Sequence, residues 1–61
     1  MRFTYHELRD CALREVKQRE RVYPRLVEQR KMSATEADRQ IAMMTEIAQY
    51  LEKRSKGERL L

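Results

Sequence analysis

The feature that most constrains the fold is a regular spacing of apolar residues in the second half of the chain. They recur at intervals of four, three, four and three positions: Ala37, Ile41, Met44, Ala48 and Leu51. This heptad spacing puts all five on one side of an α-helix and suits packing against a nearly antiparallel helix. Just before them, Ser33 and Glu36 form a capping-box pattern, Ser-Ala-Thr-Glu. We therefore predict a helix over about residues 34–54.

The first half of the chain carries another apolar stripe behind a second capping-box pattern. Thr4 and Glu7, in Thr-Tyr-His-Glu, predict that a helix starts near residue 4. Apolar residues then share one helical face: Tyr5, Leu8, Ala12, Val16, Tyr23, Leu26 and Val27. Pro24 predicts a kink or a break, and we favour one kinked helix because the stripe keeps its phase across it. The prediction is a helix over about residues 4–29 and a turn at residues 30–33.

The composition agrees with an all-α fold. The 61 residues include a single glycine and a single proline, and 39% of them are charged. Few helix breakers with many Arg, Glu, Gln and Ala residues are typical of helices. We expect one domain over residues 1–61, built as an antiparallel helical hairpin. Gly57 predicts the end of order, so residues 55–61 are expected to form a frayed tail.

The later helix carries a further apolar stripe. Met43, Ile47 and Tyr50 are spaced four and three and lie about 100° around the helix from the heptad positions. They either pack beneath the ends of the first helix or form an interface with a second copy or another protein. We favour an interface, since one helix cannot cover so wide an arc and so short a chain is near the size limit for independent folding. We predict a homodimer, an antiparallel four-helix bundle with this stripe at its twofold interface.

The positive charge of the chain is concentrated in residues 14–31, whose net charge of +4 equals that of the whole chain. Four basic residues in this segment lie within about 80° of one another on the helix, opposite the apolar stripe: Arg14, Lys17, Arg21 and Arg25. This basic ridge is suited to follow a phosphate backbone or to dock onto an acidic protein surface. A solvated, arginine-rich helix face is the third interpretation. No aromatic residue interleaves the ridge, which disfavours stacking on single-stranded nucleic acid.

No residue pattern in the sequence predicts catalysis. His6 is the only histidine and Cys11 the only cysteine, and on a helix they point about 140° apart, which suits neither a Cys–His pair nor a metal site. There is no glycine-rich phosphate loop and no paired-ligand spacing. We therefore expect no enzyme activity, no catalytic or metal-binding residues and no cofactor.

The sequence also bears on location. No apolar run is long enough to span a bilayer, and no signal-peptide pattern is present. We expect a soluble, cytoplasmic protein. A basic helix lying on a membrane surface is disfavoured, because the apolar stripe of the first helix is needed within the hairpin.

Four segments between about Glu7 and Leu51 resemble a family of small helical proteins encoded in bacteriophage and prophage genomes, whose function is unassigned. The segments are Arg-Glu-Val at 14–16, Val-Tyr-Pro-Arg-Leu-Val at 22–27, Lys-Met-Ser at 31–33 and Glu-Ala-Asp-Arg-Gln-Ile-Ala-Met-Met at 36–44. Members of that family often have glycine before the Lys-Met step, where this chain has Arg30. The resemblance implies a phage accessory protein that acts in the cytoplasm of a bacterial host.

Two functional hypotheses follow. The first is a non-enzymatic accessory protein that binds and modulates a host protein, for example in a defence or nucleic-acid-processing complex, as the resemblance to phage proteins implies. The second is a dimeric helical bundle that binds nucleic acid through the basic ridge. The wide apolar arc of the later helix favours the first hypothesis, and the charge distribution favours the second.

Overall fold

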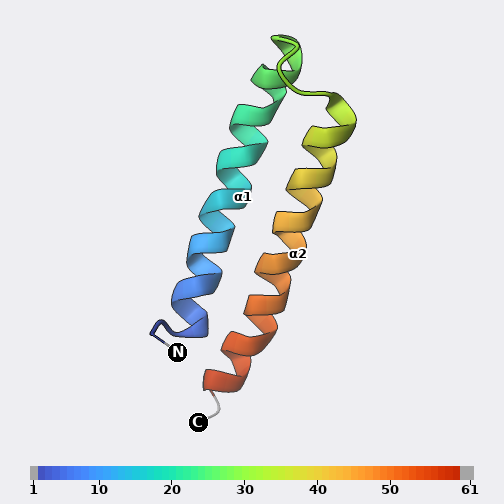
Figure 1. Cartoon of the computed structure of the whole chain (residues 1–61). Helices are drawn as coiled ribbons and strands as arrows, with labels where there is room; N and C mark the ends of the chain where they lie inside the picture. The colour runs from blue at the N-terminus through green and yellow to red at the C-terminus, as the bar shows by residue number, and fades with distance from the viewer. Residues whose placement is uncertain (1, 60–61) are drawn as a thin grey trace.

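The computed structural model describes residues 2–59, with side-chain surroundings as far as residue 57. Two helices, α1 (Tyr5–Glu28) and α2 (Ala34–Arg59), run antiparallel and pack along their whole length (Figure 1). The molecule is elongated, with extents of 47 × 16 × 16 Å. Residues 2–59 contain no strand. The prediction of an all-α helical hairpin is confirmed.

The start of α1 follows the predicted capping box. The hydroxyl of Thr4 accepts a hydrogen bond from the backbone N–H of Glu7 at 3.1 Å, and the Glu7 carboxylate accepts one from the backbone N–H of Thr4 at 3.2 Å. This reciprocal pair satisfies N–H groups that have no partner inside the helix. It fixes the first residue of α1 at Tyr5, one position after the predicted start.

The turn after α1 is a Schellman motif with arginine in the position that usually holds glycine. The backbone N–H of Arg30 donates to the Val27 carbonyl at 3.0 Å, and that of Lys31 donates to the Leu26 carbonyl at 2.9 Å. Arg30 has φ of 60°, in the left-handed region where a Cβ atom is crowded. Arg30 therefore holds a backbone position that usually takes glycine, at some cost in strain.

Pro24 lies inside α1, which continues through it to Glu28. The helix is therefore not broken into two, and a kink at Pro24 stays a prediction. Only one further turn follows the proline, so the ring disturbs little helix beyond it. Tyr23 and Val27, on either side of Pro24, are both partly buried, which holds this last turn in place.

The second helix begins as predicted and ends later than predicted. Its first turn is capped by the Ser33 hydroxyl, which accepts from the backbone N–H of Glu36 at 3.0 Å. The prediction of a frayed tail from residue 55 is wrong for residues 55–59, which continue α2. Ser55 is completely buried and donates its hydroxyl to the Glu52 carbonyl at 2.8 Å, so the hairpin holds the helix beyond residue 54. Gly57 is tolerated because glycine costs only about 1 kcal/mol relative to alanine inside a helix; residues 60 and 61 lie outside the described range.

Small residues form the contact between the two helices. Ala12, Ala37 and Ala48 are each at most 5% exposed, and Ser55 is the one other residue buried to that degree in the described part of the chain. Alanine lets two helix backbones approach closely. The larger residues of the heptad seam, Ile41 and Leu51 among them, are only partly buried. The predicted seam thus faces α1, but the hairpin encloses no large apolar core.

Two arginines of α1 reach across to α2. Arg9 forms an ion pair with Glu52 at 2.8 Å, and this hydrogen bond, followed by one to Asp10, raises the pKa of Arg9 above its usual value. Arg19, which interrupts the apolar stripe, donates to the backbone carbonyl of Gln40 at 2.9 Å. A polar residue in the stripe is therefore used to join the helices.

Candidate interaction surfaces

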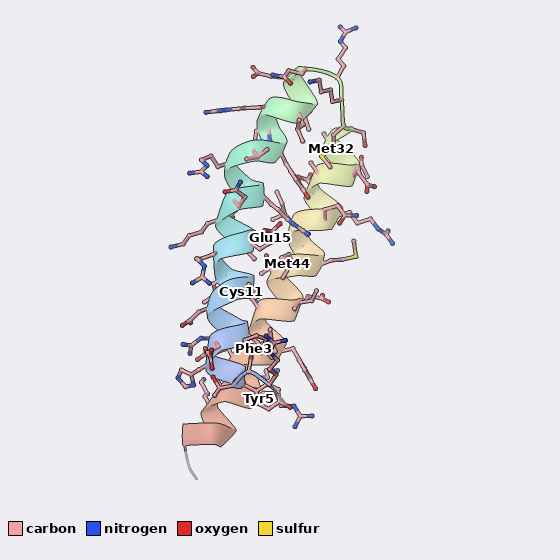
Figure 2. All side chains as sticks on the ribbon, turned by 60° about the vertical axis from the view of Figure 1, so that its left-hand side comes forward. Phe3, Tyr5, Cys11, Glu15, Met32 and Met44 are labelled. Atoms are coloured by element: carbon pink, nitrogen blue, oxygen red, sulfur yellow. The ribbon has the colours of Figure 1, made fainter. Side chains whose placement is uncertain are left out.

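The basic ridge lies on the side of α1 that faces away from α2. Its four residues, Arg14, Lys17, Arg21 and Arg25, are all exposed, as Figure 2 illustrates for the outward-pointing side chains of α1. From Arg14 to Arg25 the ridge extends for roughly 16 Å, at 1.5 Å per residue of helix. The prediction that these residues share one outer face therefore agrees with their exposure.

The four ridge residues form no ion pair among the described residues, although Glu7 and Asp10 line the same groove as Arg14. Arg21 donates to the amide oxygen of Gln18 at 2.7 Å. In contrast, Arg9 and Arg19 are both paired with carboxylates and turned toward the hairpin. The ridge charges are therefore directed into solvent, where they can attract an acidic surface.

The apolar stripe on α2 is exposed. Met43, Ile47 and Tyr50 are 41%, 48% and 55% exposed respectively. They do not pack beneath the ends of α1, which was one of the two interpretations of their spacing. Large apolar side chains that cluster on a helix surface mark interaction sites in many proteins. Whether a partner covers this stripe stays a prediction.

Arg54 and Tyr5 extend the stripe from Tyr50 toward the chain ends. Arg54 donates from Nε to the hydroxyl of Tyr50 at 3.1 Å, and this hydrogen bond raises the pKa of Arg54 above its usual value. Its guanidinium lies 5.4 Å from the ring centroid of Tyr50 and 5.9 Å from that of Tyr5, within the range of a cation–π contact. Tyr, Arg and Met are enriched at protein interfaces. Sequence reasoning missed Arg54, although its position four residues after Tyr50 was a usable signal.

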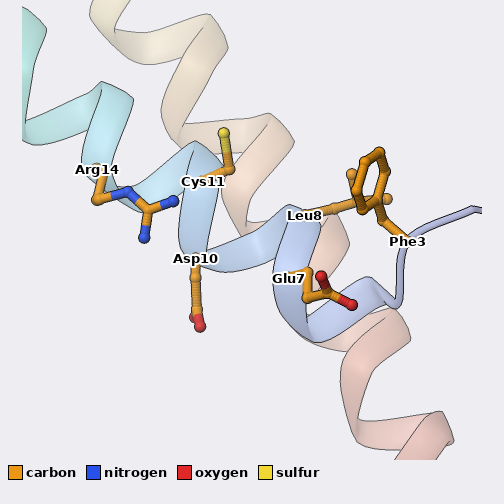
Figure 3. A pocket seen from close by; sticks show the side chains of 6 residues that line it. All are labelled: Phe3, Glu7, Leu8, Asp10, Cys11 and Arg14. Atoms are coloured by element: carbon orange, nitrogen blue, oxygen red, sulfur yellow. The ribbon is translucent and has the colours of Figure 1, made fainter.

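Phe3 adds an exposed apolar side chain outside the helices. Its ring lies beside Leu8, in an open groove of about 370 Å³ that also includes Cys11 (Figure 3). Glu7, Asp10 and Arg14 form the polar part of the lining. Sequence reasoning missed Phe3 because it precedes α1, where helical periodicity carries no information.

Cys11 and His6, the residues considered for chemistry in the sequence, both lie in α1. Cys11 is exposed, and His6 comes from the first turn of α1. In the described residues, no three or more His, Cys, Asp and Glu side chains come together in a way that could hold a metal ion. Neither helix, within the same residues, has an apolar stretch that could cross a membrane.

Comparison with known proteins adds no family assignment. No protein-family model, no curated protein and no solved structure matches this chain. The basic ridge and the apolar surface of the hairpin are therefore the features of this chain that bear on its function.

Proposed function

We propose that this chain is a non-enzymatic, phage-type accessory protein that binds a host protein in the bacterial cytoplasm and modulates it stoichiometrically. The observation that carries the proposal is the contrast between interior and surface. Buried apolar side chains are alanines, whereas larger ones such as Ile47 and Tyr50 are exposed beside an unpaired basic ridge. Such a distribution suits a protein that acts by contact.

The basic ridge supplies the contact with the foreign partner. Four cations along one helix face complement an acidic protein surface, and their long-range attraction raises the rate of encounter. The attraction acts over about one Debye length and weakens as salt is added. The partner in this proposal is therefore a host protein with an acidic surface that a helix of this length can follow.

Nucleic acid is the second candidate partner, and the unpaired state of the ridge favours it. None of the four cations forms an ion pair in the described part of the chain, so each is available to a phosphate. Four phosphate contacts on duplex DNA give a slope of about −3.6 in a plot of log affinity against log salt concentration. The absence of aromatic residues on the ridge restricts this candidate to duplex or structured nucleic acid.

A matched pair of variants separates these two candidates. The first replaces all four ridge residues with glutamine, and the second replaces four exposed basic residues elsewhere: Lys31, Arg39, Lys53 and Lys56. Both lose four positive charges, and glutamine keeps the helix propensity of lysine and arginine. Each tagged protein is then used to capture partners from bacterial lysate, with and without nuclease treatment.

The protein-binding proposal predicts one stoichiometric, saturable protein partner that survives nuclease treatment, is lost with the ridge variant and is kept with the control variant. Nucleic acid that co-purifies without such a protein, together with a gel shift that weakens steeply with salt, supports the second candidate instead. Equal loss of binding in both variants would show that net charge alone drives capture. The ridge would then not be the specific contact with the partner.

A further inference from the structure

We propose that a second copy of this chain covers one side of the hairpin, so that the protein is a symmetric dimer with its basic ridges left open. The proposed interface, called the apolar side below, lies along both helices. Its members are Leu8, Cys11, Val22 and Leu26 of α1 with Met44, Ile47 and Leu51 of α2, and Met43 and Tyr50 lie at its edge. This widens the interface predicted from α2 alone.

The helical geometry puts these residues on the same side. With Ala12 and Ala48 facing across the contact, Cys11 and Ile47 each lie about 100° to one side at 3.6 residues per turn. Each rotation is taken about the helix's own axis, viewed along its chain direction. Because the helices are antiparallel, equal rotations in the same sense then lead to the same side of the hairpin. The opposite rotation reaches Leu13 and Gln49, and these two residues line one shared groove, which confirms the sense of the rotation.

The two sides of the hairpin differ in polarity. The groove side has Thr45, Gln49 and Glu52 from α2, with Leu13 as its exposed large apolar residue. Nearer the turn, a second groove on this side is lined by partly buried apolar residues such as Tyr23, Val27 and Ile41. The apolar side has leucine, valine, methionine and isoleucine along both helices, and its Met43–Ile47–Tyr50 edge is exposed. A second copy on the apolar side therefore covers three exposed large apolar residues, Met43, Ile47 and Tyr50, against Leu13 on the groove side.

The exposed area matches what a dimer needs. The chain exposes 5125 Å², whereas a compact protein of this mass exposes roughly 4,200 Å². The difference is close to the area of about 800 Å² that each partner buries in an interface of standard size. One long side of a body measuring 47 × 16 Å has an outline of roughly 750 Å². A single copy of the same hairpin therefore covers the excess surface.

The charges allow a second copy on this side. The ion pair between Glu15 and Arg19, at 2.9 Å, lies on the apolar side and is neutral as a unit. The basic ridge points away from α2, about a quarter turn from the apolar side. Two copies with a formal net charge of +4 each can therefore meet without facing their ridges. The same arrangement puts two ridges on one particle, which strengthens binding to an extended partner.

Two aliphatic residues give a matched test. Ile47 and Leu13 are 48% and 46% exposed, lie mid-helix and occupy opposite sides. Sedimentation velocity of the wild type, Ile47→Glu and Leu13→Glu is measured from about 1 to about 100 µM, with circular dichroism to check the helix content. We expect a dimeric wild type, a Leu13→Glu variant that stays dimeric, and dimerisation weakened on the order of a hundredfold in Ile47→Glu.

Three results would overturn the proposal. The wild type could be monomeric at about 100 µM, the highest concentration of the series. Alternatively, the two substitutions could weaken dimerisation equally, or Leu13→Glu could weaken it more than Ile47→Glu. A monomeric, folded wild type would leave the apolar side to a foreign apolar partner. If Ile47→Glu loses its helix content, Ile47→Ala and Leu13→Ala repeat the contrast with the residue of highest helix propensity. Since the ridge variants leave the apolar side unchanged, failure here is distinguishable from failure of partner capture.

Discussion

The two apolar stripes of α2 have opposite environments. The inner stripe, with Ala37 and Ala48, faces α1 and has small residues at its most buried points. The outer stripe, with Met43, Ile47 and Tyr50, has large residues and is about half exposed. A chain that folded alone would gain more by burying the large side chains. The distribution indicates that the small residues set the distance between the helices, while the large ones are available for association.

The most damaging change to the inner stripe is an enlargement of a buried alanine. Ala48→Leu forces extra methylene groups between two closely packed helices, and overpacking of this kind costs about 1–3 kcal/mol. Ala42→Leu is the matched control, because Ala42 is exposed on the same helix. Urea unfolding followed by circular dichroism is the measurement. Equal free energies of unfolding for the two variants would contradict the close packing at Ala48.

The polar residue within the α1 stripe gives an intermediate effect. Arg19→Ala removes the hydrogen bond to the Gln40 carbonyl and the pairing with Glu15. We expect a loss of about 1.5 kcal/mol, as is typical of a hydrogen bond with one charged partner. Arg21→Ala serves as control, since Arg21 bonds only the exposed Gln18. If both variants unfold at the same urea concentration, Arg19 does not join the helices in solution.

The smallest effect concerns the turn that sets the register of both stripes. Arg30→Gly relieves the left-handed backbone at φ of 60°, which costs a residue with a Cβ atom about 1 kcal/mol. We expect the midpoint of thermal unfolding to rise. Arg30→Ala removes the same charge but keeps the Cβ atom, so it should bring no such rise. If Arg30→Ala also raises the midpoint, the loss of the positive charge explains the stabilisation, and relief of the backbone does not.

Much of the fold could be predicted from local sequence. The capping pattern at Thr4 and the heptad spacing at Ala37–Leu51 determine hydrogen bonds and faces within single helices, so the pattern identified them. The end of α2 could not be predicted in this way, because the burial of Ser55 is a property of the folded hairpin and leaves no local pattern in the sequence. Gly57 did not end the helix, because α2 continues through it to Arg59.

Of the two candidate surfaces, the basic ridge could be predicted from the sequence, and the apolar side could not. The ridge residues Arg14 and Arg25 share a face by helical spacing alone, and the structure keeps them exposed. The apolar side could not be derived from one helix, because it requires knowing which side of α1 lies beside Ile47. That information comes from the pairing of the helices. Phe3, which lies outside both helices, shares a groove with Leu8 and Cys11 of the apolar side.

If association completes this hairpin, the thermal unfolding of the wild type must depend on protein concentration. When folding is coupled to dimerisation, mass action raises the unfolding midpoint with protein concentration. For two chains of this length, a hundredfold increase should raise the midpoint by roughly 10 °C. We predict this rise, and we predict that Ile47→Ala lowers the whole series of midpoints. A midpoint that stays constant from about 1 to about 100 µM would contradict the account.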